Sequence, residues 1–199
     1  RVKMHRSLPE GAKIKSAVFT LESDIWRVAL ACEVPVLAAN YDDAAIGIDV
    51  GANHLATDSN GYHYANVRPL DKRQKELRRA ARGLARTCRG SKRRKKAIAK
   101  LQRVQRSVRN HRRTHLHNVA NAIVKTASTI VVEDLKLKNM TRSVKGTLVE
   151  PGKNVRQKAG LNRVLQDAAP GRLFDMLVYK AESAGGQIIK IDPRNTSRT

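Results

Sequence analysis

Long hydrophobic runs are missing from this chain. Among its 199 residues, no stretch approaches the ~20 consecutive apolar residues of a membrane-spanning helix. No apolar signal region follows the charges at the N-terminus. These absences predict a cytoplasmic protein without a membrane partner. The length suits one dominant domain with a full hydrophobic core.

Cysteine and aromatic residues are also scarce. Cys32 and Cys88 lie far apart in different predicted elements, so they form neither a disulfide framework nor a zinc site by themselves. Aromatic residues make up 4% of the chain, which argues against base stacking as its main mode of nucleic-acid binding. Any such binding must therefore depend on charge.

Acidic residues are few compared with basic ones. Lys and Arg number 40 against 17 Asp and Glu, which gives a formal charge of +23 and a pI near 10.9. Such an excess favours a polyanionic partner, and nucleic acid is a better candidate than an anionic membrane surface. Residues 68–113 hold 20 of the basic residues but only two acidic ones, Asp71 and Glu76.

The pattern of apolar residues divides the chain near residue 43. Residues 12–37 alternate in short apolar and polar runs, which predicts two or three antiparallel strands in a β-rich segment, residues 1–43. Residues 44–199 begin with three strand-like runs, of which the second and third flank an Asn60-Gly61 turn. We expect these residues to form an α/β domain.

A helical hairpin is predicted from Pro69 to about Ala127, with a break at residues 89–91. Apolar residues of its second helix fall on one stripe, and basic residues lie on other faces. A run of charge is usually a solvated face, but opposing charge is scarce here, so a phosphate backbone is the better partner. The candidate nucleic-acid-binding residues are Lys92, Arg93, Lys96, Lys100, Arg103 and Arg106.

The C-terminal third returns to an α/β pattern. Residues 129–132 predict a buried strand, and residues 136–159 predict a surface loop because they lack a clear period. A helical stripe over residues 161–184 is interrupted at Pro170-Gly171, and residues 187–192 predict a final strand.

Two carboxylates lie at the ends of apolar strands. Asp49 ends the run AAIGID, and Glu133 ends the run TIVVE. Burying a carboxylate costs several kcal/mol unless a cation or solvent compensates it, so the pair suggests a shared divalent-metal site. In phosphodiester hydrolysis, such oxygens hold two Mg²⁺ or Mn²⁺ ions ~4 Å apart. The alternative is that Asp49 caps a turn and Glu133 pairs with a nearby Lys.

Four segments in order carry a family resemblance: IGIDVGANHLATDSNG, the basic stretch GSKRRKKA, IVVEDLKLKNM and LVYKAESAGGQIIKIDPRNTSRT. They resemble the RuvC-type nuclease core of the TnpB family. Members of this family are transposon-encoded RNA-guided endonucleases related to type V CRISPR effectors. The resemblance implies an RNase H-like mixed sheet with an inserted basic helical hairpin. It also implies that residues 1–43 are the end of a wedge-like β-barrel domain.

The resemblance assigns roles to single residues. It implies that Asp49 and Glu133 are catalytic metal ligands for Mg²⁺ or Mn²⁺. In the family, a zinc ribbon with two Cys-x-x-Cys pairs comes after the segment that matches DPRNTS, and a third catalytic Asp comes after the ribbon. We therefore expect this chain to be a partial one. Asp192 precedes the ribbon position and is expected to cap a turn instead. His111 and His115 have zinc-ligand spacing, but packing or phosphate contact is the favoured interpretation.

The resemblance implies an RNA-guided, metal-dependent DNA endonuclease with guide RNA and target DNA as partners, in a prokaryotic cytoplasm. In this interpretation the basic hairpin contacts the nucleic-acid backbone, and base pairing supplies the sequence specificity. The alternative is a non-cleaving nucleic-acid-binding protein, either a transposon relic or a guide-dependent DNA-binding repressor. Metal-dependent cleavage distinguishes the two.

Overall fold

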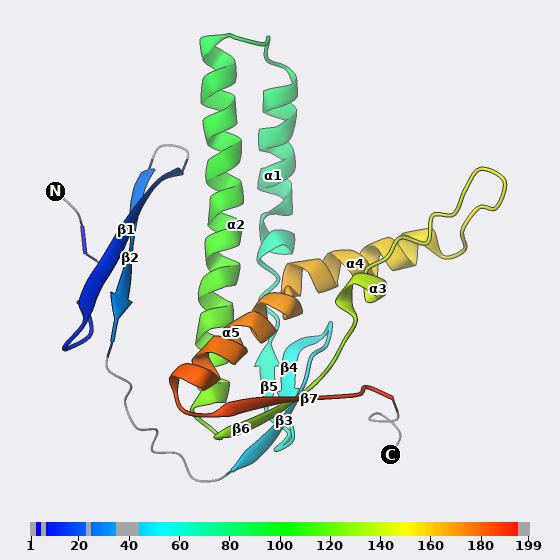
Figure 1. The fold of residues 1–199 in the computed structure, drawn as a ribbon. Helices are drawn as coiled ribbons and strands as arrows, with labels where there is room; N and C mark the ends of the chain where they lie inside the picture. Colours follow the sequence, from blue (N-terminus) through cyan, green and yellow to red (C-terminus); the bar gives the residue numbers. More distant parts are fainter. Residues whose placement is uncertain (1–2, 5–6, 23–24, 35–43, 195–199) are drawn as a thin grey trace.

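The computed structural model describes residues 3–4, 7–22, 25–34 and 44–194 (Figure 1). This part of the chain forms a two-stranded sheet, a five-stranded mixed sheet and five helices, so the predicted α/β class is confirmed. The elements in chain order are β1 (Lys13–Glu22), β2 (Ile25–Glu33), β3 (Ala45–Asp49), β4 (His54–Asp58), β5 (His63–Ala65), α1 (Pro69–Ala85), α2 (Lys92–Val124), β6 (Thr129–Glu133), α3 (Leu137–Met140), α4 (Val155–Ala168), α5 (Pro170–Ser183) and β7 (Gln187–Ile191).

Strands β1 and β2 pair antiparallel in a sheet of their own, as their alternating pattern predicts. Large apolar side chains on this hairpin are exposed, including Phe19 at 65% and Trp26 at 66%. The hairpin approaches α2 through Glu22, whose carboxylate pairs with Arg109 and whose carbonyl accepts a hydrogen bond from Arg106 at 3.0 Å. The predicted boundary near residue 43 lies outside the described residues.

The five-stranded sheet has the order β5-β4-β3-β6-β7. Strands β3, β4 and β5 are antiparallel neighbours, and the Asn60-Gly61 turn joins β4 to β5 as predicted, with Gly61 at a φ of 82°. Strands β3, β6 and β7 are parallel, which requires crossover connections. Helices α1 and α2 lie in the crossover from the antiparallel strands to β6, and α4 and α5 lie in the crossover to β7.

Helices α1 and α2 form a helical hairpin, here called the arm, which extends away from the sheet (Figure 1). The predicted break at residues 89–91 is confirmed. Gly90 adopts a φ of 78°, and the Ser91 hydroxyl oxygen accepts a hydrogen bond from the Arg94 amide at 3.1 Å. Ser91 thereby satisfies one of the free amides at the start of α2.

Helices α4 and α5 meet at Ala169, which adopts a left-handed φ of 53° before Pro170 begins α5. The predicted interruption is therefore confirmed. The prediction of a loop over residues 136–159 is partly wrong, because it misses the single-turn helix α3 and the start of α4 at Val155. Four residues make barely one turn, too few to produce the periodicity on which the prediction depended.

One face of the five-stranded sheet carries the core. Ile46 and Ile48 of β3 and Ile130 and Val132 of β6 are at most 4% exposed. Apolar side chains of α2 and α5 join them in one cluster, namely Leu116, Val119, Ile123, Leu173 and Leu177. Because side chains alternate along a strand, the intervening residues of β3 and β6 point to the other face.

Candidate active site

Asp49 and Glu133 come together because β3 and β6 pair in parallel. The register joins Ile46 to Ile130 and Ile48 to Val132, and one further step places Asp49 beside Glu133. Ile48 and Val132 point into the core, so the two carboxylates project from the opposite face of the sheet. Two residues that are 84 positions apart in the sequence thus become neighbours.

The two carboxylates line a single pocket of about 320 Å³. The pocket also includes residues of β4 and β7, with Thr57 on one side and Ile191 on the other. Asp49 is exposed and Glu133 is half-buried, so water and ions can reach both. None of the described residues that line the pocket is Lys, Arg or His, although the whole chain has a formal charge of +23.

Electrostatic conditions in the pocket disfavour a charged Asp49. Partial desolvation raises the pKa of Asp49, and the negative charge of Glu133 raises it further. A hydrogen bond from the Val50 backbone amide has the opposite, smaller effect. A divalent cation would relieve both unfavourable effects, since hard oxygen ligands are those that Mg²⁺ and Mn²⁺ prefer.

A third carboxylate lines the same pocket but serves a turn. Asp58 is 8% exposed, and its Oδ1 accepts hydrogen bonds from the backbone amides of Asn60 and Tyr62 at 3.0 and 2.9 Å. The Tyr64 hydroxyl lies 3.5 Å from Oδ2. Sequence reasoning did not single out Asp58, although an Asp two positions before Asn-Gly is a typical turn residue.

Two histidines lie beside the pocket on β4 and β5. The Nδ1 atom of His63 is 3.0 Å from the hydroxyl of Thr57, which lines the pocket. The His54 and His63 rings stack with their centroids 4.3 Å apart. Sequence reasoning missed this pair, because nine positions of separation across a strand turn carry no recognisable spacing.

Two further sequence predictions, for Asp192 and His115, agree with the structure. Asp192 caps its turn as predicted, since its Oδ1 accepts a hydrogen bond from the Arg194 amide at 3.0 Å. His115 Nε2 lies 2.7 Å from the Ala65 carbonyl oxygen, which agrees with packing rather than zinc binding. In the described ranges no group of three or more His, Cys, Asp or Glu could hold a metal ion.

The predicted nucleic-acid-binding residues lie along α2. Lys92, Arg93, Lys96, Lys100 and Arg103 are exposed toward the outer half of the arm, and Arg106 is half-buried against the β1–β2 hairpin. These residues present positive charge to solvent along several turns of one helix. No helix in the described part is long and apolar enough to cross a membrane.

The architecture is shared with a nucleic-acid-bound protein of known structure. The chain superimposes on the protein in the cryo-EM structure of the Cas12f1-sgRNA-target DNA complex with a TM-score of 0.51 and 20% sequence identity. The match covers 87% of this chain and 34% of that one. At this identity the similarity establishes the fold class, a mixed α/β domain like that of Cas12f1, and no more.

Sequence similarity identifies the family. The family model OrfB_IS605, described as a probable transposase, matches residues 29–144. The chain therefore belongs to this family, the TnpB family of transposon-encoded proteins, as the sequence motifs predicted.

Curated relatives agree with this assignment. The chain is 36% identical over 186 residues to the "Putative RNA-guided DNA endonuclease InsQ" of Escherichia coli (strain K12), a match that covers 93% of this chain and 46% of that protein. It is 31% identical over 192 residues to a "Putative RNA-guided DNA endonuclease" of Streptomyces pristinaespiralis, with coverage of 96% and 44%. The chain thus spans about half the length of these relatives.

Proposed function

We propose that this protein is an RNA-guided, metal-dependent DNA endonuclease of the TnpB type, with Asp49 and Glu133 among its metal ligands. The observation that carries the proposal is the pairing of these two carboxylates in one pocket whose described lining holds no basic side chain. The names of the curated relatives support DNA cleavage as the reaction, and the family membership supports the dependence on a guide RNA.

We assign the sheet to the RNase H-like, RuvC-type class. Support comes from its order, in which antiparallel β5-β4-β3 is followed by parallel β6 and β7. The arm lies between β5 and β6, which corresponds to the inserted basic hairpin. In this assignment the carboxylates lie where β3 and β6 end, and residues 1–43 belong to a separate wedge-like domain.

Asp49 and Glu133 would hold Mg²⁺ or Mn²⁺. Their oxygens are the donors that these ions prefer. Partial burial and the charge of Glu133 both raise the pKa of Asp49, and a bound cation would oppose this shift. When bound, such an ion stabilises the charge on the oxygens of a phosphodiester. The role of the protein residues is to fix the position of the ion at the strand ends.

The arm would hold the backbone of the guide RNA and target DNA. Five of its exposed basic residues, Lys92, Arg93, Lys96, Lys100 and Arg103, supply charge without base-specific geometry, so they position the nucleic acid while pairing supplies specificity. The proposal therefore separates two tasks between two parts of the molecule: cleavage at the pocket and retention on the arm.

Cleavage of target DNA by the complete gene product, with guide RNA and Mg²⁺, tests the pocket. Asp49→Ala or Glu133→Ala should lower the single-turnover rate at least ~10³-fold, because loss of a metal ligand removes several kcal/mol of transition-state stabilisation. Guide RNA affinity should stay within about twofold. The matched control is Asp175→Ala, an exposed acidic residue on α5. Normal cleavage by either pocket variant would contradict the assignment.

Substitutions on the arm should have the opposite effect: they should weaken RNA binding and leave the cleavage step intact. Replacing Lys92, Lys96 and Lys100 together with Ala should weaken RNA binding and flatten its dependence on salt, because fewer counterions are released. With each single-stranded contact contributing about 0.7 to the slope, the loss should be about 2. Cleavage should recover at saturating RNA. An unchanged slope would show that these three residues do not contact phosphate.

A further inference from the structure

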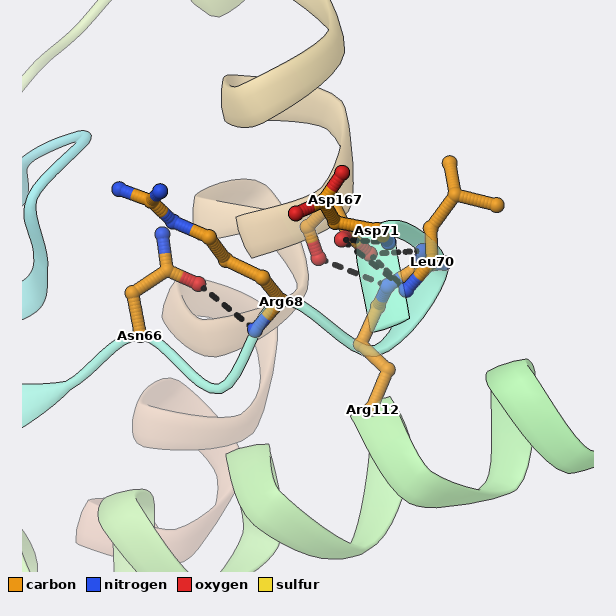
Figure 2. A network of polar contacts seen from close by, with 6 residues as sticks. All are labelled: Asn66, Arg68, Leu70, Asp71, Arg112 and Asp167. Carbon is orange, nitrogen blue, oxygen red and sulfur yellow. Dashed lines mark hydrogen bonds and ion pairs between the residues drawn. The ribbon is translucent and has the colours of Figure 1, made fainter. Parts of the chain in front are cut away.

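Asp167 is the most buried charged residue in the described part of the chain. It lies on α4, near the base of the arm, and is 3% exposed. A buried carboxylate is stable only with several good partners, so its surroundings show what it stabilises. Figure 2 shows these partners, which come from α1 and α2.

The first group of partners is the N-terminus of α1. The residue before this helix, Arg68, has a left-handed φ of 44° and supplies no capping side chain. The Asp167 carboxylate instead accepts hydrogen bonds from the Leu70 amide at 3.0 and 3.1 Å and from the Asp71 amide at 3.3 Å. Leu70 and Asp71 occupy the second and third positions of α1, and their backbone amides are the ones that an ordinary N-cap side chain would accept hydrogen bonds from. A residue about 97 positions away therefore caps the helix.

The second partner is Arg112 of α2. Its Nη2 donates to Asp167 Oδ1 at 2.7 Å and its Nε donates to the Asp167 carbonyl oxygen at 2.8 Å. The forked guanidinium thus holds both the side chain and the backbone of Asp167. Asp167 consequently joins α1, α2 and α4 at one point.

The same point is connected to the pocket. Asn66 accepts a hydrogen bond from the Arg68 amide at 3.3 Å and donates one through Nδ2 to the Ala52 carbonyl oxygen at 3.0 Å. Ala52 lies three residues after Asp49, in the loop that leaves β3. A short series of hydrogen bonds therefore links the start of the arm to the loop that follows Asp49.

We propose that Asp167 is a positioning residue, which holds the arm at a fixed angle to the pocket that contains Asp49 and Glu133. About 20 residues of α2 extend from Arg112 to the tip of the arm, a length of about 30 Å at 1.5 Å per residue. A tilt of about 10° at Arg112 would move the tip by about 5 Å over that length. Misplacement of a substrate by about 1 Å already slows many enzymes. The consequence for cleavage rests on the proposed function, whereas the geometry of the arm does not.

A distance measurement tests the proposal without any nuclease assay. Spin labels on Cys88, in the exposed loop at the tip of the arm, and on Asn60→Cys, in the exposed β4–β5 turn, report the angle by pulsed EPR. Cys32→Ser removes the second native thiol. Asp167→Asn keeps the size of the side chain and loses its charge, and should broaden the distance distribution by several Å. Asp175→Asn, on α5, is the matched control and should match the parent chain.

The proposal is overturned if Asp167→Asn stays folded and gives the same distance distribution as Asp175→Asn. If circular dichroism shows that Asp167→Asn does not fold, Arg112→Lys decides the outcome, since lysine keeps the charge but lacks the forked donors. A broadened distribution for Arg112→Lys supports the proposal, and an unchanged one overturns it. Arg113→Lys, an exposed neighbour, is its control.

Single-turnover cleavage by the complete gene product adds a readout that loss of stability alone would not change. At a temperature where Asp167→Asn is fully folded and at saturating guide RNA, the rate should fall about 10²-fold while RNA affinity changes less than about twofold. An unchanged rate would contradict the positioning role. If the parent protein itself does not cleave, the proposed function fails, and the distance measurement still decides the role of Asp167.

Discussion

The pocket and the base of the arm both depend on carboxylates, but they treat the charge in opposite ways. Asp167 is 3% exposed and receives three backbone hydrogen bonds and a guanidinium. Asp49 is exposed, lies beside the like charge of Glu133, and receives one backbone hydrogen bond that lowers its pKa. The chain supplies partners for the first carboxylate and places a competing charge next to the second.

This difference separates a structural charge from a charge suited to a ligand. A buried ion pair with satisfied hydrogen bonds fixes the geometry of the elements that it joins. A pair of neighbouring carboxylates is unfavourable until a cation binds, so its free energy depends on a ligand. The same substitution at both sites, Asp to Asn, tests this contrast.

The largest effect is expected at Asp167. Asp167→Asn leaves Arg112 without its anionic partner and weakens the cap of α1, so it should lower the free energy of unfolding by about 3 kcal/mol. Asp49→Asn should change it by less than about 0.5 kcal/mol in metal-free buffer. Urea unfolding of both variants measures the difference. Equal losses at the two positions would remove the contrast between them.

An intermediate effect is expected when Mg²⁺ is added. If Asp49 and Glu133 bind the ion, Mg²⁺ at ten times its dissociation constant should stabilise the parent chain by about 1.4 kcal/mol. Asp49→Asn and Glu133→Gln should lose this gain, and Asp167→Asn should retain it despite its lower stability. Thermal unfolding with and without chelator measures the stabilisation of each chain by Mg²⁺. Stabilisation of Asp49→Asn equal to that of the parent would place the ion elsewhere.

The smallest effect is expected from pH. The folded chain raises the pKa of Asp49 above its ordinary value of 3.8, so the folded state holds this proton more tightly than the unfolded state. Stability from this group is therefore present at low pH and is lost as pH rises from 3.8 through the raised pKa. Over that pH interval the free energy of unfolding of the parent chain should fall by less than about 1 kcal/mol relative to that of Asp49→Asn, because solvent screens an exposed group.

Urea unfolding in chelator at a series of pH values measures this difference. Subtraction of the Asp49→Asn result cancels the titration of carboxylates remote from Asp49, so the difference in the free energy of unfolding reports on the interacting pair of Asp49 and Glu133. A parent chain that becomes more stable than Asp49→Asn as pH rises would contradict the sign.

Local patterns in the sequence predicted most of the elements. The Asn60-Gly61 turn, the Ser91 cap and the Pro170 interruption all depend on neighbouring residues, and the structure has each of them. Asp49 and Glu133 were recognisable for the same reason, since each ends an apolar strand. What the pattern missed was short or irregular, such as the single turn of α3.

The sequence by itself determined where most of the strands and helices lie, that β3 and β6 end in a carboxylate, and that α2 carries positive charge. These properties follow from spacing and turn chemistry within a few residues. Only the tertiary structure decided that Asp49 lies beside Glu133 and that Asp167 caps α1. Both relations join residues more than 80 positions apart, and they depend on the register of parallel strands and the packing of helices, which no local pattern specifies.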